Sequence, residues 1–252
     1  MKRAKPKPSK KTILLVDDHP ASRVGVRHMI ETEPDLMVCG EAGSSSEALD
    51  AAIALSPCLV ITDVTMPGQS GLELIQDLAA RCPDIYVLVL SMHSEFTYAR
   101  RALEVGARGY LMKTADGNEL LRAIRTILAG KIFLSPAASA QMLEYLNNRS
   151  HRKRTGIEAL SPREFEIFSL LGHGVPSNKI AEQLNLSLKT VDTHRERIKR
   201  KLEVENVSEL VSLASTWLTE QSMTCQAQGD KTLECSFLGT KSARTVMPSP
   251  RS

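Results

Sequence analysis

Five side chains that could carry chemistry stand at the ends of short apolar runs. The run ILLV ends at Asp17 and Asp18, CLVIT at Asp63, YVLVL at Ser91, and GYLM at Lys113. Three carboxylates that share a site repel one another unless a cation lies among them, and hard oxygen ligands suit Mg²⁺. A lysine and a hydroxyl beside them could hold an anionic group. Such a set could take a phosphoryl group onto a carboxylate oxygen.

The elements that would bring these side chains together are five alternating strands and helices. Near-continuous aliphatic runs alternate with amphipathic stretches from Thr12 to about Lys131. Aliphatic strands of this kind are buried on both faces, which requires a parallel sheet covered by helices on each side. In such a sheet, ligands bind at the carboxyl ends of the strands. We therefore predict a doubly wound, five-stranded parallel α/β domain over residues 12–131, with the five side chains on one edge.

The sequence pattern of residues 157–221 predicts a second, small all-α domain. Helix starts are indicated at Ser161-Pro162 and at Ser187. Between them and beyond, NKIAEQLNLSLKTVDTHRERIKRKL has the pattern of a helix, a short turn and a second helix. The basic residues of that second helix could reach DNA phosphates. A merely solvated helix face is the alternative, because Asp192 and Glu196 interrupt the positive charge.

The remaining segments carry little structural signal. Residues 1–11 hold six Lys or Arg and no acid, and we expect a disordered basic arm. Residues 132–156 are expected to form one helix and the exposed linker HRKRTG, and residues 222–252 a disordered tail. The predicted α/β domain has ten basic and sixteen acidic residues, whereas residues 151–218 have eleven and nine. This asymmetry predicts different partners for the two domains.

Composition narrows the class of protein further. No apolar run approaches the roughly 20 residues of a membrane helix, and the basic N-terminus lacks the apolar core of a signal peptide. We expect a cytoplasmic protein. Cys39, Cys58 and Cys82 lie in or beside apolar segments without metal-site spacing, so we expect buried thiols.

The first domain resembles the receiver domain of two-component response regulators in ILLVDDHP, ITDVTMPGQSGLELI, LVLSMHS and GARGYLMK. The resemblance implies a flavodoxin-like fold in which a histidine kinase phosphorylates Asp63, with Mg²⁺ as cofactor. It makes Asp18 and Asp63 direct metal ligands together with the Thr65 carbonyl, and Asp17 an outer ligand. Ser91 and Tyr110 match the switch residues and Lys113 the phosphate-binding lysine, although ordinary packing remains an alternative for Tyr110. Met92 is bulkier than the Ala or Gly usual at its position, which leaves the phosphoryl lifetime open.

The second domain resembles the LuxR-type, or NarL-type, helix-turn-helix domain in LSPRE, NKIAEQL and KTVDTHRERIKRKL. By this resemblance the helix from Leu188 to about Leu202 enters the major groove, with Asp192, Thr193 and Glu196 facing bases. The expected DNA contacts are Lys179, Ser187, Lys189, Thr190, Asp192, Thr193, Arg195, Glu196, Lys199 and Arg200. The stretch SELVSLASTWL resembles the dimerising helix, with an apolar edge of Leu210, Val211, Ala214 and Trp217. Packing of that edge within its own domain is the alternative.

The two resemblances predict a response regulator that binds DNA as a homodimer to control transcription, and not an enzyme in the usual sense. One rival is a Mg²⁺-dependent phosphohydrolase with an aspartate nucleophile, but that class has DxD at its first strand, and this chain has adjacent aspartates followed by His19. Another is a constitutive DNA-binding protein whose receiver serves only for protein contact. The intact Asp63, Lys113 and acid pair argue against it.

Overall fold

The computed structural model describes residues 10–66, 70–148 and 156–220. Almost all of the predicted basic arm, most of the predicted linker and the whole predicted tail, which contains Cys225 and Cys235, lie outside these ranges. Cys39, Cys58 and Cys82 are free and only partly buried, so these thiols are less buried than expected. Within the described ranges no helix has the length and apolar character needed to cross a membrane.

The first domain contains a five-stranded, all-parallel sheet with the strand order β2-β1-β3-β4-β5. The predicted fold class is therefore confirmed. Its elements are β1 (Lys11–Val16), α1 (Pro20–Glu31), β2 (Leu36–Ala42), α2 (Ser45–Leu55), β3 (Leu59–Thr62), α3 (Gly71–Arg81), β4 (Tyr86–Ser91), α4 (Glu95–Glu104), β5 (Gly109–Met112), α5 (Gly117–Leu128) and α6 (Pro136–Asn148).

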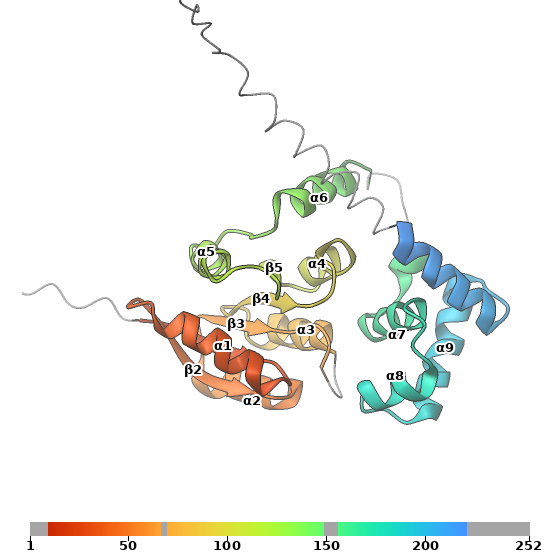
Figure 1. The fold of residues 1–252 in the computed structure, drawn as a ribbon, viewed down its shortest axis with the longest axis horizontal. Coiled ribbons are helices and arrows are strands. Elements are labelled where there is room, and N and C mark those ends of the chain that lie inside the picture. Colours follow the sequence, from red (N-terminus) through yellow and green to blue (C-terminus); the bar gives the residue numbers. More distant parts are fainter. Residues whose placement is uncertain (1–9, 67–69, 149–155, 221–252) are drawn as a thin grey trace, which may run out of the picture.

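Both faces of the sheet are covered, as the unbroken aliphatic strands require. Helices α1 and α5 cover one face of the sheet, and α2, α3 and α4 cover the other (Figure 1). Ile13 and Leu15 belong to the apolar core under α1 and α5, whereas Leu14 and Val16 belong to the core on the opposite face. All four side chains are almost fully buried. Side chains alternate across a strand, so a strand that is apolar at every position supplies two cores. The polar residues that follow the strands are thereby held at one edge.

The second domain is helical. It contains η2 (Gly156–Ala159), α7 (Pro162–Gly172), α8 (Ser177–Gln183), α9 (Leu188–Leu202) and a last helix over residues 207–220. Ser161 begins α7 with a capping box completed by Glu164, and the Ser187 hydroxyl accepts a hydrogen bond from the Thr190 amide at the start of α9. Both helix starts expected from the sequence are therefore confirmed.

Helix α7 joins the two domains in space. It lies between the α/β domain and α9 in Figure 1 and packs against α3. Nearly every residue of α7 is buried, because one side meets its own domain and the other meets the sheet domain. The two domains therefore share a continuous apolar core.

Candidate phosphorylation site and DNA-binding surface

The Asp63 carboxylate lies just beyond β3 and is held from three sides. Its Oδ1 accepts hydrogen bonds from the Ser91 hydroxyl at 2.6 Å and from the Val64 amide at 2.6 Å. Its Oδ2 lies 2.7 Å from the Lys113 ammonium. Ser91 ends β4 and Lys113 follows β5, so neighbouring parallel strands deliver both partners. The convergence expected from the strand ends is thus present.

Asp17 shares the same lysine. Its Oδ2 is 2.7 Å from Lys113 Nζ and accepts a hydrogen bond from the Ser22 hydroxyl at 2.7 Å. Burial raises the pKa of Asp17, but these hydrogen bonds outweigh it and leave the pKa below its ordinary value. Burial likewise lowers the pKa of Lys113, and its bonds to Asp17 and Asp63 raise it by more. Asp17 is therefore a charged carboxylate beside a charged Lys113 ammonium at neutral pH.

The acid pair could also hold a cation. Asp17, Asp18 and His19 place ligand atoms within 4.8 Å of one another. Oxygen donors dominate this set, and Asp18 and Asp63 line one cleft, which fits a hard divalent ion such as Mg²⁺. His19 is a member that the sequence did not single out, and its Nδ1 lies 2.7 Å from Asp18 Oδ1. The imidazole is largely exposed and lies at the rim of the set.

The expected switch residues Ser91 and Tyr110 are both fully buried. The Tyr110 hydroxyl donates to the backbone carbonyl of His93 at 2.9 Å, and burial raises its pKa well above the ordinary value. A second contact was not predicted: the Thr65 hydroxyl and His93 Nε2 lie 2.7 Å apart beside the site. The sequence gives one indication of this contact: Thr65 and His93 each come two positions after a polar residue that follows or ends a strand, Asp63 and Ser91.

The helical domain closes one side of the site. A cleft of about 790 Å³ is lined by Asp18, Asp63, Met92 and Lys113 of the sheet domain and, from the helical domain, by Leu170, Glu182 and Gln183. Met92 is 63% exposed there. Nothing in the sequence indicated this arrangement, because it depends on how the two domains dock.

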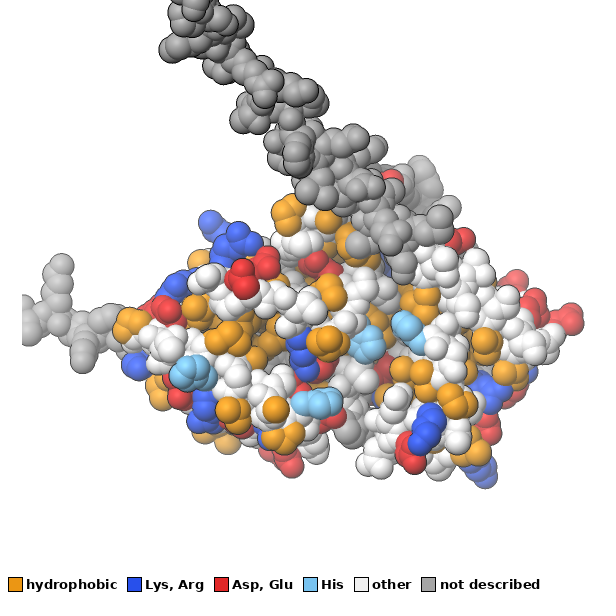
Figure 2. Space-filling view, in the orientation of Figure 1, with side chains coloured by type: hydrophobic (Ala, Val, Ile, Leu, Met, Phe, Trp, Pro, Cys, Tyr) orange, Lys and Arg blue, Asp and Glu red, His pale blue; other side chains and the backbone are white. Residues whose placement is uncertain are grey.

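Seven of the ten expected DNA-contacting residues are exposed, on α8, at the N-cap of α9 or on α9 itself. Lys179, Ser187, Lys189, Asp192, Thr193, Glu196 and Arg200 are exposed, whereas Thr190, Arg195 and Lys199 are partly buried. Acids and bases pair along the helix: Arg195 Nη1 lies 2.8 Å from Asp192 Oδ1, and Lys199 Nζ lies 2.9 Å from Glu196 Oε1. Figure 2 likewise shows Lys, Arg, Asp and Glu interspersed on the visible face of this domain. The positive charge of α9 is therefore locally compensated.

Comparison with known proteins agrees with both domains. The receiver-domain model of response regulators matches residues 13–125, and the model of bacterial regulatory proteins of the luxR family matches residues 158–214. The transcriptional activator protein ExaE of Pseudomonas putida is 39% identical over 202 residues, which cover 80% of this chain and 94% of ExaE. The chain is a response regulator of the LuxR family.

Two further relatives extend the likeness over both domains of the response regulator. The nitrate/nitrite response regulator protein NarL of Escherichia coli K12 is 32% identical, over 83% of this chain and 95% of NarL. A structure of RcsB from Salmonella enterica serovar Typhimurium, bound to a promoter in the presence of phosphomimetic BeF3−, has a TM-score of 0.57 and 26% identity. It covers 82% of this chain and all of that chain. The family regulates transcription, and the phosphohydrolase alternative is set aside.

The receiver holds the LuxR-type domain through α4. Arg101 donates hydrogen bonds to the carbonyls of Leu160, at 3.1 Å, and Ile157, at 2.5 Å. Its guanidinium carbon lies 3.7 Å from the ring centroid of Phe165, and Tyr98 meets the same ring edge-on at 5.3 Å. Because Tyr98 also contacts the His93 ring, packed side chains connect the phosphorylation site with α7.

A buried ion pair lies at the base of α7. Arg163 and Glu166 are 2.6 Å apart and almost fully buried, and the Arg163 guanidinium also donates to the Leu184 carbonyl. Burial raises the pKa of Glu166 to about 7, although Arg163 opposes the shift. The pair secures α7 to α8 and so fixes the unit that faces the receiver.

The residues of the expected dimerising edge differ in their burial. Leu210 and Ala214 are fully buried inside the LuxR-type domain, where Ala214 lies close to Gly172 of α7. Val211 and Trp217 are partly buried, and Trp217 packs on Phe165 at 5.6 Å. Leu210 and Ala214 are therefore unavailable to a second copy here. The exposed Leu213 marks the outward side of the helix, and dimerisation through this helix stays a prediction.

Proposed function

We propose that Asp63 is the phosphoacceptor of this response regulator and that a histidine kinase is the donor. The observation that carries the proposal is the Asp63 carboxylate held between Lys113 and Ser91. A carboxylate oxygen of Asp63 would form a bond to phosphorus while the bond from phosphorus to the kinase imidazole breaks. Lys113 balances the charge of the arriving group, and the Ser91 hydroxyl is placed to donate to it.

Mg²⁺ fits the acidic edge, and when bound it would neutralise charge on the transferring phosphoryl oxygens. Asp18, Asp63 and the Thr65 carbonyl would hold it directly, and Asp17 would act as an outer ligand. Asp17 has a second task, because it shares Lys113 with Asp63 and keeps the ammonium beside the acceptor.

A test of the acidic edge is Asp18→Ala. We expect Mg²⁺ to bind at least about tenfold more weakly and phosphate incorporation from a small acyl phosphate to slow accordingly, since a carboxylate ligand is lost. Asp50→Ala, on the outer surface of α2, serves as the matched control and should leave both quantities unchanged. An unaltered metal titration of Asp18→Ala would exclude Asp18 as a ligand.

We further propose that the receiver spans residues 12–131, the helix and linker 132–156 and the LuxR-type domain 157–221. The protein would act in the cytoplasm as a DNA-bound homodimer. Helix α9 would lie in the major groove, with Asp192, Thr193 and Glu196 toward bases and Lys189, Arg195 and Lys199 toward phosphates. The RcsB complex with a promoter supports this docking by analogy.

The two classes of residue on α9 should behave differently. Lys199→Ala should weaken binding to all DNA about equally and reduce the salt slope by roughly one, because a phosphate contact releases counterions but reads no base. Glu196→Ala should shift discrimination at one base pair by about 1 to 3 kcal/mol. It should also raise affinity for random DNA, since Glu196 pairs with Lys199 in the free protein.

Affinities for a selected site and for scrambled DNA, measured over a salt series, separate the two classes. Arg122→Ala on α5, which lies in the receiver, is the control. If the Glu196 variant keeps the wild-type sequence preference while the Lys199 variant changes it, α9 docks differently and the base-facing assignments are wrong.

Activation would follow from separation of the two domains. In the closed arrangement the acidic receiver lies beside α8, where the DNA backbone would pass, and Glu182 of α8 lines the phosphorylation cleft. A phosphoryl group on Asp63 would place extra negative charge in that cleft beside Glu182. We propose that this repulsion, together with movement at Ser91 and Tyr110, shifts the population toward the open form.

A further inference from the structure

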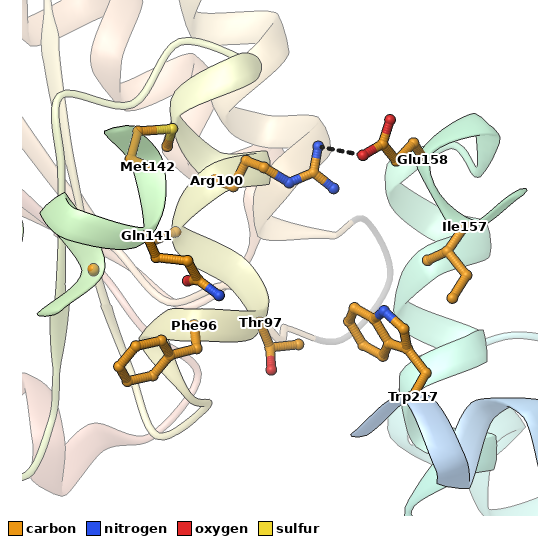
Figure 3. A pocket seen from close by; sticks show the side chains of 10 residues that line it. Phe96, Thr97, Arg100, Gln141, Met142, Ile157, Glu158 and Trp217 are labelled. Atoms are coloured by element: carbon orange, nitrogen blue, oxygen red, sulfur yellow. Dashed lines mark ion pairs between the residues drawn. The ribbon is translucent and has the colours of Figure 1, made fainter. Parts of the chain in front are cut away.

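A second cavity lies between the two domains, away from the phosphorylation site. It has a volume of about 210 Å³, and helices α4 and α6 of the receiver form one wall, while η2 and the last helix form the other. In Figure 3, Phe96, Thr97, Arg100, Gln141 and Met142 lie on one side of it and Ile157, Glu158 and Trp217 on the other. None of its lining residues takes part in the proposed phosphotransfer or in the proposed DNA contacts. Trp217 belongs to the expected dimer edge.

The volume sets the size of an occupant. An apolar cavity of about 150 Å³ is enough to bind benzene. A cavity of 210 Å³ therefore accommodates one aromatic ring with a short polar extension.

The apolar part of the lining favours an aromatic ring. Trp217 turns its indole ring toward the receiver side of the cavity, and Met142 and Ile157 supply a thioether and an aliphatic surface, whereas the Phe96 ring points away from Trp217. Aromatic rings gain from edge-to-face contacts with other rings and from contacts with methionine sulfur. An aliphatic chain of the same size would bury similar area without these contacts.

The polar end of the cavity has charges of both signs. Arg100 of α4 lies 3.8 Å from Glu158 of η2, longer than a direct charge-assisted hydrogen bond, and 2.9 Å from Glu104. Among the described residues that line the cavity, Arg100 and Glu158 put one cation and one carboxylate at this end, and a simple anion would meet Glu158. A simple cation would meet Arg100. A ligand with both an ammonium and a carboxylate satisfies Glu158 and Arg100 together, and the Gln141 amide and Thr97 hydroxyl can complete its hydrogen bonds.

We propose that this cavity binds a small zwitterionic aromatic molecule, such as an aromatic α-amino acid, and that the ligand holds the two domains closed. Because its walls come from both domains, such a ligand binds the closed form and not the open one. By linkage it opposes DNA binding. Only this effect on DNA rests on the proposed function; the binding itself does not.

Trp217 provides a direct probe, because it is the single tryptophan of the chain. In the full-length protein, titration with L-phenylalanine should give a saturable change in tryptophan emission with a dissociation constant of about 1 mM or lower. Phenylacetate lacks the ammonium and 2-phenylethylamine lacks the carboxylate, so both should bind at least about tenfold more weakly. Absence of a saturable change with L-phenylalanine overturns the proposal, as does equal binding of all three.

Two matched substitutions locate the binding. Glu158→Gln keeps the shape of the cavity but removes the negative charge that would face the ammonium, and should weaken L-phenylalanine binding about tenfold. Glu104→Gln removes the other carboxylate that meets Arg100, but Glu104 does not line the cavity, so affinity should stay within about twofold. An equal effect of the two substitutions contradicts the assigned site.

The effect of the ligand on DNA affinity is measured in a separate experiment. With L-phenylalanine at ten times its dissociation constant, the DNA dissociation constant of the unphosphorylated protein should rise up to about elevenfold. Saturable emission without any change in DNA affinity would overturn the coupling of the domains by the ligand. Failure of the phosphorylated protein to bind DNA in the absence of ligand would instead contradict the proposed function, so the two failures are distinguishable.

Discussion

Asp63→Asn is expected to reduce phosphate incorporation to background while the fold is retained. The amide is nearly the same size as the carboxylate, and its oxygen can still accept from the Val64 amide and the Ser91 hydroxyl that now contact Oδ1. It cannot, however, form the acyl phosphate. The ion pair with Lys113 is also lost, which removes the charge that holds the ammonium at the acceptor. Mass measurement of the intact protein after treatment with an acyl phosphate and Mg²⁺ checks this result.

Asp50→Asn is the matched control, since it makes the same substitution on the exposed outer surface of α2. It should be phosphorylated at the wild-type rate. Circular dichroism of both variants should be that of the wild type. Labelling of Asp63→Asn at the wild-type rate would show that another residue is the acceptor.

Arg101→Ala is expected to raise DNA affinity about tenfold without phosphorylation. Its guanidinium makes two hydrogen bonds to backbone carbonyls of the LuxR-type domain and stacks on Phe165, and the side chain is 7% exposed. Hydrogen bonds from charged groups contribute about 1.5 to 3 kcal/mol each, so losing them shifts the opening equilibrium by at least about tenfold. DNA affinity should follow, because the open form is the one that binds. Fluorescence anisotropy on a selected site provides the measurement.

Arg108→Ala controls for the loss of an arginine in the same domain, because Arg108 lies over Tyr86 of the receiver and not at the domain contact. It should leave DNA affinity unchanged. Thermal unfolding of both variants establishes that the domains remain folded. If Arg101→Ala and Arg108→Ala bind DNA equally, the contact through α4 does not restrain the LuxR-type domain.

The fold and the phosphorylation site could be predicted because they depend on local patterns. Strands that are apolar at every position require a covered parallel sheet, and a parallel sheet brings its strand ends together. Asp17, Asp63, Ser91 and Lys113 meet for that reason alone. The helix starts at Ser161 and Ser187 were equally local.

The domain contact could not be predicted in the same way. The amphipathic pattern of α4 identifies the side that packs on the sheet, but not which surface of another domain will meet Tyr98 and Arg101. The apolar stripe of the last helix had the same ambiguity, since a domain core and a dimer edge require the same residue types. Leu210 and Ala214 proved to be core. The contact between Thr65 and His93 depends on the conformations of two loops, which no periodic pattern in the sequence predicts.

Whether phosphorylation controls the LuxR-type domain is tested by the DNA affinity of the full-length protein with and without an acyl phosphate donor in the presence of Mg²⁺, measured in parallel on Asp63→Asn. We expect the donor to increase the wild-type affinity for a selected site at least about tenfold and to leave the variant unchanged. A donor that phosphorylates Asp63 without changing DNA affinity would contradict the claim that phosphorylation controls the LuxR-type domain. An equal increase in the variant would contradict the role of Asp63.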